Sequence, residues 1–291
     1  MGAVGQVAPP ERRSTAFGMV TVAFSIGMFI MAPLLQYLIN LYGWSKALQA
    51  SGGLVLIISL LALGLPGNSP KKEKSSEPEA ESELTLLKTI NGAMSHSGYL
   101  LLNVGFFVCG FHVAFIGTHL PSFLQSEGIS ISTASWALAM IGLFNMFGSM
   151  IFGRMGDSLS KKNLLSLLYT LRAVVIAGFL AIPLNEITAI AFGAAIGFLW
   201  LATVPLTSGI VAQVFGTRYL STLWAIVFFS HQLGAFLGVW LGGRVYDATG
   251  SYTPVWLASI ALGLLAGIIH LPIREQPWKP SALEPQTSGS D

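Results

Sequence analysis

Several polar side chains lie near the centres of long apolar stretches, where they could bind a solute or carry a proton. They are His112, Asn145, Arg172, Thr203 and His231, with Trp200, Thr207 and Gln232 close by. Inside a membrane, each polar group needs a partner or a water-filled cavity. Because five stretches bring such a group to one depth, we predict a solute-binding site near the bilayer midplane.

Most of these residues also have a structural interpretation. His112 and His231 are either hydrogen-bonding groups between helices or proton carriers, and no apolar stretch contains an Asp or Glu that would titrate instead. Trp200 faces either a cavity or lipid. The remaining amide and hydroxyl side chains could simply bridge helices, where each hydrogen bond contributes roughly 1 kcal/mol. They belong to Asn145, Thr203, Thr207 and Gln232.

Arg172 has two interpretations that the sequence leaves open. The planar guanidinium binds carboxylates through two hydrogen bonds, so an arginine at mid-depth indicates a carboxylate substrate. The alternative is structural pairing with backbone carbonyls or with a polar neighbouring helix.

The apolar stretches determine the class of protein. They are 19 to 23 residues long and cover residues 16–38, 47–65, 98–120, 133–152, 164–183, 188–210, 219–241 and 253–271. About 20 helical residues cross the hydrocarbon layer. The chain has 15 Lys and Arg and 13 Asp and Glu residues, and only Arg172 lies inside a stretch. The pattern predicts an all-α polytopic membrane protein with eight transmembrane helices. Within the seventh stretch, the spacing of Gly234, Gly238 and Gly242 predicts close helix packing.

Other classes of protein find little support in the sequence. The net charge of +2 gives no indication of nucleic-acid binding, and the single cysteine, Cys109, excludes intrachain disulfides and thiolate metal sites. The spans contain no pair of titrating groups, no H-E-x-x-H motif and no nucleophile motif. We therefore expect neither an enzyme nor a cofactor or metal, and the absence of a Walker motif argues against ATP-driven transport.

The loops predict the orientation in the membrane. With eight spans, the loops on the side of both termini hold twelve basic residues, whereas the other side holds Lys46 and Arg244. The positive-inside rule then predicts a multi-pass protein of the inner (plasma) membrane with both termini in the cytoplasm.

A polar segment divides the chain unevenly. The residues from Asn68 to Lys88 are rich in Lys, Glu, Ser and Pro, so residues 66–97 are predicted to form a disordered cytoplasmic linker. The other expected units are residues 1–65 with two spans, residues 98–271 with six, and a cytoplasmic tail at 272–291.

An internal repeat accounts for this division. A shift of 207 residues gives seven identities in 30 positions, including Gly27 with Gly234 and Gly43 with Gly250. The first two spans therefore match the last two of a six-span unit. The same shift would map the four spans of residues 98–210 to positions before Met1. About 110 residues with four further spans are therefore expected there.

The loop after the fourth span carries a family resemblance. Its residues from Gly153 to Lys162 are GRMGDSLSKK, where the glycines permit a tight reversal and Asp157 suits a helix start. This loop resembles the signature G-x-x-x-D-x-x-G-R-K of the major facilitator superfamily, with Ser160 in place of glycine and Lys161 in place of arginine. The segment from Phe228 to Tyr252 is similar to the eleventh span and following loop of bacterial members near the monocarboxylate-transporter branch.

The resemblance covers spans five to twelve of a twelve-span protein and implies a gate. In the family, this aspartate joins the carboxy-terminal half to the start of the fifth span. Here we expect Asp157 to bind Arg13 or the Ser14 amide in one access state, with a solvated turn as the alternative. The other expected gating residues are Gly153, Arg154, Lys161 and Lys162. The resemblance also implies that the spans of His112 and Thr203 line the central cavity, and that the span of Arg172 lies outside it.

The sequence thus predicts a secondary active transporter that moves a small organic solute by alternating access, as a symporter or antiporter. A monocarboxylate is the favoured solute, and if transport is coupled to protons, a histidine is the available carrier. The alternative is a truncated, non-transporting fragment or a membrane interaction protein that retains the carboxy-terminal half.

Overall fold

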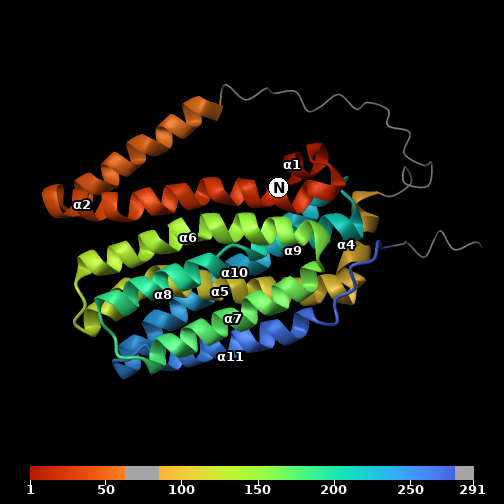
Figure 1. Cartoon of the computed structure of the whole chain (residues 1–291). Coiled ribbons are helices and arrows are strands. Elements are labelled where there is room, and N and C mark those ends of the chain that lie inside the picture. The colour runs from red at the N-terminus through yellow and green to blue at the C-terminus, as the bar shows by residue number, and fades with distance from the viewer. Residues whose placement is uncertain (63–84, 279–291) are drawn as a thin grey trace, which may run out of the picture.

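The computed structural model describes residues 1–62 and 85–278, and within these residues the regular structure is entirely helical. Figure 1 shows the long helices lying side by side with alternating directions, so that their ends form the two ends of a bundle. In chain order they are α2 (Arg13–Ala62), α5 (Ser97–Ser126), α6 (Ile131–Ser158), α7 (Lys161–Ala181), α8 (Glu186–Leu199), α9 (Thr203–Phe215), α10 (Leu220–Thr249) and α11 (Thr253–His270). The shorter helices are α1 (Gly2–Val7), the 3₁₀ turn η1 (Pro10–Arg12) and α4 (Leu86–Ser95). The predicted all-α polytopic membrane fold is confirmed.

The number of spans differs from the predicted eight. The described residues contain seven helices that are long and apolar enough to cross a membrane, because stretch 16–38 and the described part of stretch 47–65 both fall in α2. This helix is interrupted at Gly43, whose φ of 78° lies in the left-handed region that glycine adopts without a steric penalty. In Figure 1 the second arm of α2 turns back from this point and diverges from the bundle.

The two arms of α2 differ in burial. The first arm packs along α6 and α9, whereas between residues 44 and 56 only Ala47 is buried. Large apolar side chains such as Trp44 and Leu48 are 73% and 66% exposed. The first arm is therefore part of the bundle, and the second arm presents its apolar surface to its surroundings.

The glycine break has a counterpart in α10. The 207-residue shift places Gly43 on Gly250, which caps the end of α10 with a φ of 70°. The first arm of α2 and the whole of α10 are thus long helices that end at a glycine with a positive φ, although ψ differs, at 165° for Gly43 and 11° for Gly250. This agreement gives the sequence repeat a structural basis.

The predicted span 188–210 is divided into α8 and α9, which are separated by Trp200, Leu201 and Ala202. Pro205 explains the division, because proline has no N–H to offer the Leu201 carbonyl and its ring would collide with that carbonyl in a continuous helix. In the first turn of a new helix, the same proline is tolerated. The break lies in the middle of the span, at the depth where the sequence concentrates polar residues.

Close packing joins α5 and α10. Gly234 lies against the backbone carbonyl of Phe107, and Gly238 lies against that of Phe111, so a Cβ at either position would overlap the carbonyl. By contrast, a Cβ at Gly243 would meet no atom within 4 Å. The glycine spacing noted in the sequence therefore corresponds to an actual contact between two helix backbones.

Two alanine substitutions in α10 should have opposite effects. Gly234→Ala is expected to destabilise the protein by about 1–3 kcal/mol, the usual cost of overpacking. Gly243→Ala is expected to stabilise it by about 0.4–1 kcal/mol, because alanine restricts the unfolded chain and meets no neighbour. Thermal unfolding in detergent, followed by circular dichroism, measures both effects. Equal shifts for the two variants would contradict the packing described here.

The expected linker 66–97 is only partly within the described residues. Residues 66–84 lie outside them, and Leu86–Ser95 form α4, where the sequence led us to expect disorder. Thr85 caps this helix by accepting a hydrogen bond from the Lys88 amide at 3.3 Å. The Trp278 ring packs against Gly92. This long-range contact stabilises a short helix that local composition does not favour.

His96 links α4 to α5. Its Nδ1 accepts a hydrogen bond from the Tyr99 amide at 3.3 Å and so caps α5. Burial lowers the pKa of His96 below its ordinary value of 6.5, and the nearby Arg274 lowers it further. The capping interaction requires the neutral ring, since an imidazolium has no acceptor.

The stability of this junction should therefore depend on pH. A histidine whose folded pKa is lowered contributes stability that is present above pH 6.5 and is lost as the pH falls through the folded pKa. His96→Asn should remove this pH dependence and keep the cap, because asparagine is also a good N-cap. Thermal unfolding of both proteins across this acidic range tests the assignment, and identical pH profiles would refute it.

Candidate functional site

The break between α8 and α9 exposes backbone carbonyls that Arg172 of α7 binds. Its Nε donates to the Leu199 carbonyl at 3.0 Å and its Nη2 donates to the same oxygen at 2.7 Å, and Nη2 also contacts the Trp200 carbonyl. The last carbonyls of a helix lack helical partners, and a cation there also interacts favourably with the helix dipole. Arg172, only 1% exposed, therefore caps the end of α8.

Asn145 of α6 binds the other side of the break. Its Oδ1 accepts a hydrogen bond from the Leu201 amide at 2.8 Å and another from Ser149 at 3.2 Å. Its Nδ2 donates to the Ser25 hydroxyl of α2 at 2.8 Å. One fully buried side chain thus connects the broken span, α6 and the first arm of α2.

The other residues predicted for the midplane site lie at different places around this break. Thr203 is fully buried at the start of α9, and Thr207 and Trp200 are 1% and 2% exposed. His112 Nε2 pairs with the Ser259 carbonyl of α11 at 2.8 Å. His231 is 7% exposed and bonds through Nδ1 to Gln232 Oε1, at 3.1 Å, but Gln232 itself is exposed on the surface of α10.

Sequence reasoning missed Cys109 as a member of this group. Its sulfur lies 3.5 Å from Arg172 Nη1 and 3.3 Å from the Thr203 hydroxyl. His231 and Tyr169 also lie beside the thiol. The available signal was the position of Cys109 three residues before His112, which puts both on neighbouring parts of one helix surface.

Removing the Asn145 amide should weaken the packing around the break. Asn145→Ala leaves the Leu201 amide without its partner inside the bundle, and such a buried group costs about 1–3 kcal/mol. Asn103→Ala is the matched control, because among the described residues the side-chain amide of Asn103 bonds within its own helix, to the Tyr99 carbonyl at 2.8 Å. The difference in thermal stability between the two variants measures the contribution of the break, and no difference would contradict it.

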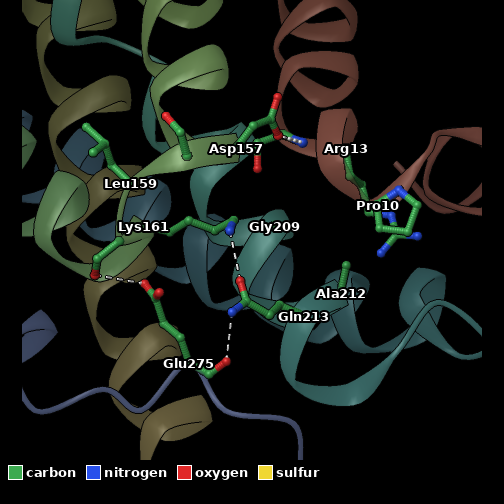
Figure 2. A pocket seen from close by; sticks show the side chains of 12 residues that line it. Pro10, Arg13, Asp157, Leu159, Lys161, Gly209, Ala212, Gln213 and Glu275 are labelled. Atoms are coloured by element: carbon green, nitrogen blue, oxygen red, sulfur yellow. Dashed lines mark hydrogen bonds between the residues drawn. The ribbon is translucent and has the colours of Figure 1, made fainter.

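A second polar site lies at the end of the bundle where α6 passes into α7, which we call the loop end. A cavity of about 620 Å³ opens there, and Figure 2 shows its lining. Asp157 accepts hydrogen bonds from the Ser14 amide at 2.8 Å, the Thr15 amide at 3.2 Å and the Thr15 hydroxyl at 2.5 Å. A carboxylate of α6 therefore caps the start of α2, where the helix dipole favours negative charge.

The expected gating residues divide around this cap. Gly153 allows the close approach, since a Cβ there would lie 3.0 Å from the Ser14 carbonyl. Arg13 extends away from Asp157 toward Pro10, as Figure 2 shows, so the carboxylate binds the Ser14 amide and not the arginine. Arg154 is exposed. The amines of Lys161 and Lys162 donate to Gln213 Oε1 and to the Leu271 carbonyl, each at 2.8 Å.

A second carboxylate at the loop end, Glu275, was not foreseen from the sequence. Its Oε1 accepts hydrogen bonds from the Lys162 amide at 2.6 Å and from the Ser160 hydroxyl at 3.3 Å, and so caps α7. Gln213 Nε2 donates to the Glu275 carbonyl at 2.9 Å, which ties this segment to α9. The signal in the sequence was a lone acidic residue directly after the last span.

Comparison with known proteins agrees with this architecture. The family model described as Major Facilitator Superfamily matches residues 1–203 and 102–288. Monocarboxylate transporter 12 of Mus musculus is 26% identical over 295 residues, which cover 90% of this chain and 60% of that protein. Monocarboxylate transporter 13 of Rattus norvegicus is 28% identical over 274 residues, with the same shares of 90% and 60%.

A bacterial relative gives a similar alignment. An uncharacterized MFS-type transporter of Bacillus subtilis, YcxA, is 24% identical over 272 residues, which cover 89% of this chain and 64% of that protein. The chain thus spans about 60% of the length of the curated relatives it matches. The family match covers nearly the whole chain, and the chain belongs to the major facilitator superfamily.

Proposed function

We propose that this chain acts in secondary active transport of a small organic solute, and that a monocarboxylate is the favoured solute. The names of two relatives state monocarboxylate transport for those proteins. The observation that carries the proposal is the Asp157 cap, because three hydrogen bonds to one carboxylate hold α2 against α6 beside a polar cavity. Water entering that cavity can replace these hydrogen bonds when the two helices separate.

The cap suits a gate that alternates between two states. In the present state, the loop end is closed between α2 and α6. A hydrogen bond to a charged group contributes about 1.5–3 kcal/mol net, and three of them on one side chain keep the contact strong yet exchangeable with water. Opening the loop end would release Asp157 from the Ser14 and Thr15 amides. If the opposite end of the bundle closes at the same time, the bilayer midplane becomes accessible from the loop end only.

The proposed orientation follows from the basic residues. The two terminal segments, the segment 66–97 and the loops 153–163 and 211–218 carry twelve of the fourteen lysines and arginines outside the spans. The positive-inside rule therefore predicts that the loop end faces the cytoplasm. The Asp157 cap would then be the cytoplasmic gate of an inner-membrane transporter. Either symport or antiport is compatible with this arrangement.

A membrane interaction protein without transport activity is the second candidate. It is favoured by the second arm of α2, whose exposed apolar side chains, Trp44 and Leu48 among them, offer a contact surface in the bilayer. Transport activity of the purified chain decides between the two candidates.

The test is uptake of labelled lactate or pyruvate by lipid vesicles that contain the purified full chain, with and without a pH gradient. A transporter should accumulate the carboxylate above the level of protein-free vesicles. Asp157→Ala should lower the rate by about tenfold, equivalent to about 1.4 kcal/mol on the barrier, because the closed state loses its cap. Asp247→Ala, at an exposed position outside the cap, is the control and should transport normally.

Two outcomes would overturn the proposal in separable ways. If the unmodified chain takes up no carboxylate, it does not transport this solute class on its own, and the interaction protein is favoured. If uptake occurs and Asp157→Ala leaves the rate unchanged, the transporter assignment holds and the gate assignment fails.

A further inference from the structure

The buried guanidinium of Arg172 lacks a carboxylate partner along the spans. It is 1% exposed, and none of the apolar stretches contains an Asp or Glu. The carbonyls of Leu199 and Trp200 satisfy its hydrogen bonds but carry no net charge. A charge in this environment is costly unless it is both paired and hydrogen-bonded. Some group near Arg172 is therefore expected to supply the negative charge.

The thiol of Cys109 is placed to do so. Its sulfur is fully buried, 3.5 Å from Arg172 Nη1 and 3.3 Å from the Thr203 hydroxyl. The titratable groups that face it are Arg172 and Tyr169 from α7 and His231 from α10, while His112 of its own helix lies near Arg172. Three neighbouring helices, α7, α9 and α10, thus surround one sulfur atom with groups able to donate hydrogen bonds.

Two of these groups are orphaned when the sulfur is regarded as a neutral thiol. Within the described residues, neither the Tyr169 hydroxyl nor His231 Nε2 makes a hydrogen bond, although both atoms are buried. Buried polar atoms without partners are rare in folded proteins and call for an explanation. A thiolate offers the Tyr169 hydroxyl a strong acceptor, whereas a neutral thiol is a weak one. Because Nδ1 of His231 donates to Gln232 Oε1, the unpartnered Nε2 is an acceptor and can take the proton of the thiol.

We propose that Cys109 and His231 form a proton-binding site in the membrane interior, in which the Cys109 thiolate is the counter-ion of Arg172. The S–H bond breaks, its electron pair stays on sulfur, and the proton passes to the unpartnered Nε2 of His231. His231 is the most exposed member of the group at 7%, so it is the member from which the proton can leave. With the proton on His231, the thiolate and the guanidinium carry charges that cancel.

This site acts on the broken span. The same guanidinium that faces the thiolate holds the carbonyls of Leu199 and Trp200, so binding a proton removes the counter-charge of the group that caps α8. Proton binding would therefore weaken the fixation of the break between α8 and α9. A role of this effect in coupling proton binding to solute transport rests on the proposed transport function, whereas the ionisation of Cys109 does not.

Infrared spectroscopy of the purified full chain in lipid vesicles tests the ionisation directly. The S–H stretching band is well separated from other protein bands, and Cys109 is the single cysteine of the chain, so every S–H signal belongs to it. An ordinary thiol keeps its proton at neutral pH. We expect no S–H band at neutral pH and its appearance on acidification. Cys109→Ser is the blank and should show no band at any pH.

Two substitutions test the partners of the thiolate. Arg172→Gln removes the positive charge and should restore the S–H band at neutral pH. Because that variant also uncaps α8 and could fail to fold, His231→Gln gives a second measurement: it removes the proton acceptor and should also restore the band. Circular dichroism verifies that each variant is folded.

The outcomes separate this proposal from the transport proposal. An S–H band at neutral pH in the unmodified chain overturns the thiolate, whatever the transport assay gives. Absence of the band in the unmodified chain, with its return in a folded partner variant, supports the site even where no carboxylate is taken up. A band that stays absent in both folded variants contradicts the assigned roles of Arg172 and His231.

Discussion

The contact between Arg172 and the carbonyls of Leu199 and Trp200 is the interaction on which the polar interior depends. A helix that ends inside a bilayer leaves carbonyl and amide groups where no water can reach them, and each such group costs several kcal/mol. Arg172 binds the carbonyl side of the break and Asn145 binds the amide of Leu201. Pro205 prevents a continuous helix, so these two side chains are what make the broken span tolerable. The arginine then brings a charge into the membrane, and the surrounding groups have to accommodate it.

The same requirement explains the loop end. Asp157 caps α2 and Glu275 caps α7, and each carboxylate comes from a different part of the chain than the helix it caps. The starts of α2 and α7 are thus points of contact between segments distant in sequence. Such contacts are polar and lie at the end of the bundle, so water can replace them, in contrast to the glycine contacts that join α5 and α10 along their length. The fold therefore combines permanent packing between some helices with exchangeable contacts between others.

The sequence predicted some parts of the site and missed others, because some features follow from local sequence patterns and others from contacts between residues distant in sequence. The membrane class was accessible because charge exclusion is a local pattern, whereas the pairing of Asp157 with the Ser14 region was implied by the family resemblance of the signature loop. Asn145 and Arg172 were recognised as needing partners, but the partners at the break are backbone atoms, which every residue possesses and which no pattern distinguishes. Cys109 was set aside because a lone cysteine suggests neither a disulfide nor a metal site. Glu275 and α4 depend on contacts across the loop end, so residues near them in the sequence give little sign of their roles.

The sequence by itself determined that this is a helical membrane protein, since only the exclusion of charge from long apolar stretches is needed for that. It also indicated close helix packing at Gly234 and Gly238, where a Cβ would overlap a backbone carbonyl. Gly153 and Gly156, which the sequence led us to expect in a tight reversal, lie within α6 instead. The tertiary structure alone decided where α8 ends, which groups surround Arg172 and which carboxylate caps which helix. These features arise from donors and acceptors brought together across the bundle, and their energies depend on distances of about 3 Å that no linear spacing encodes.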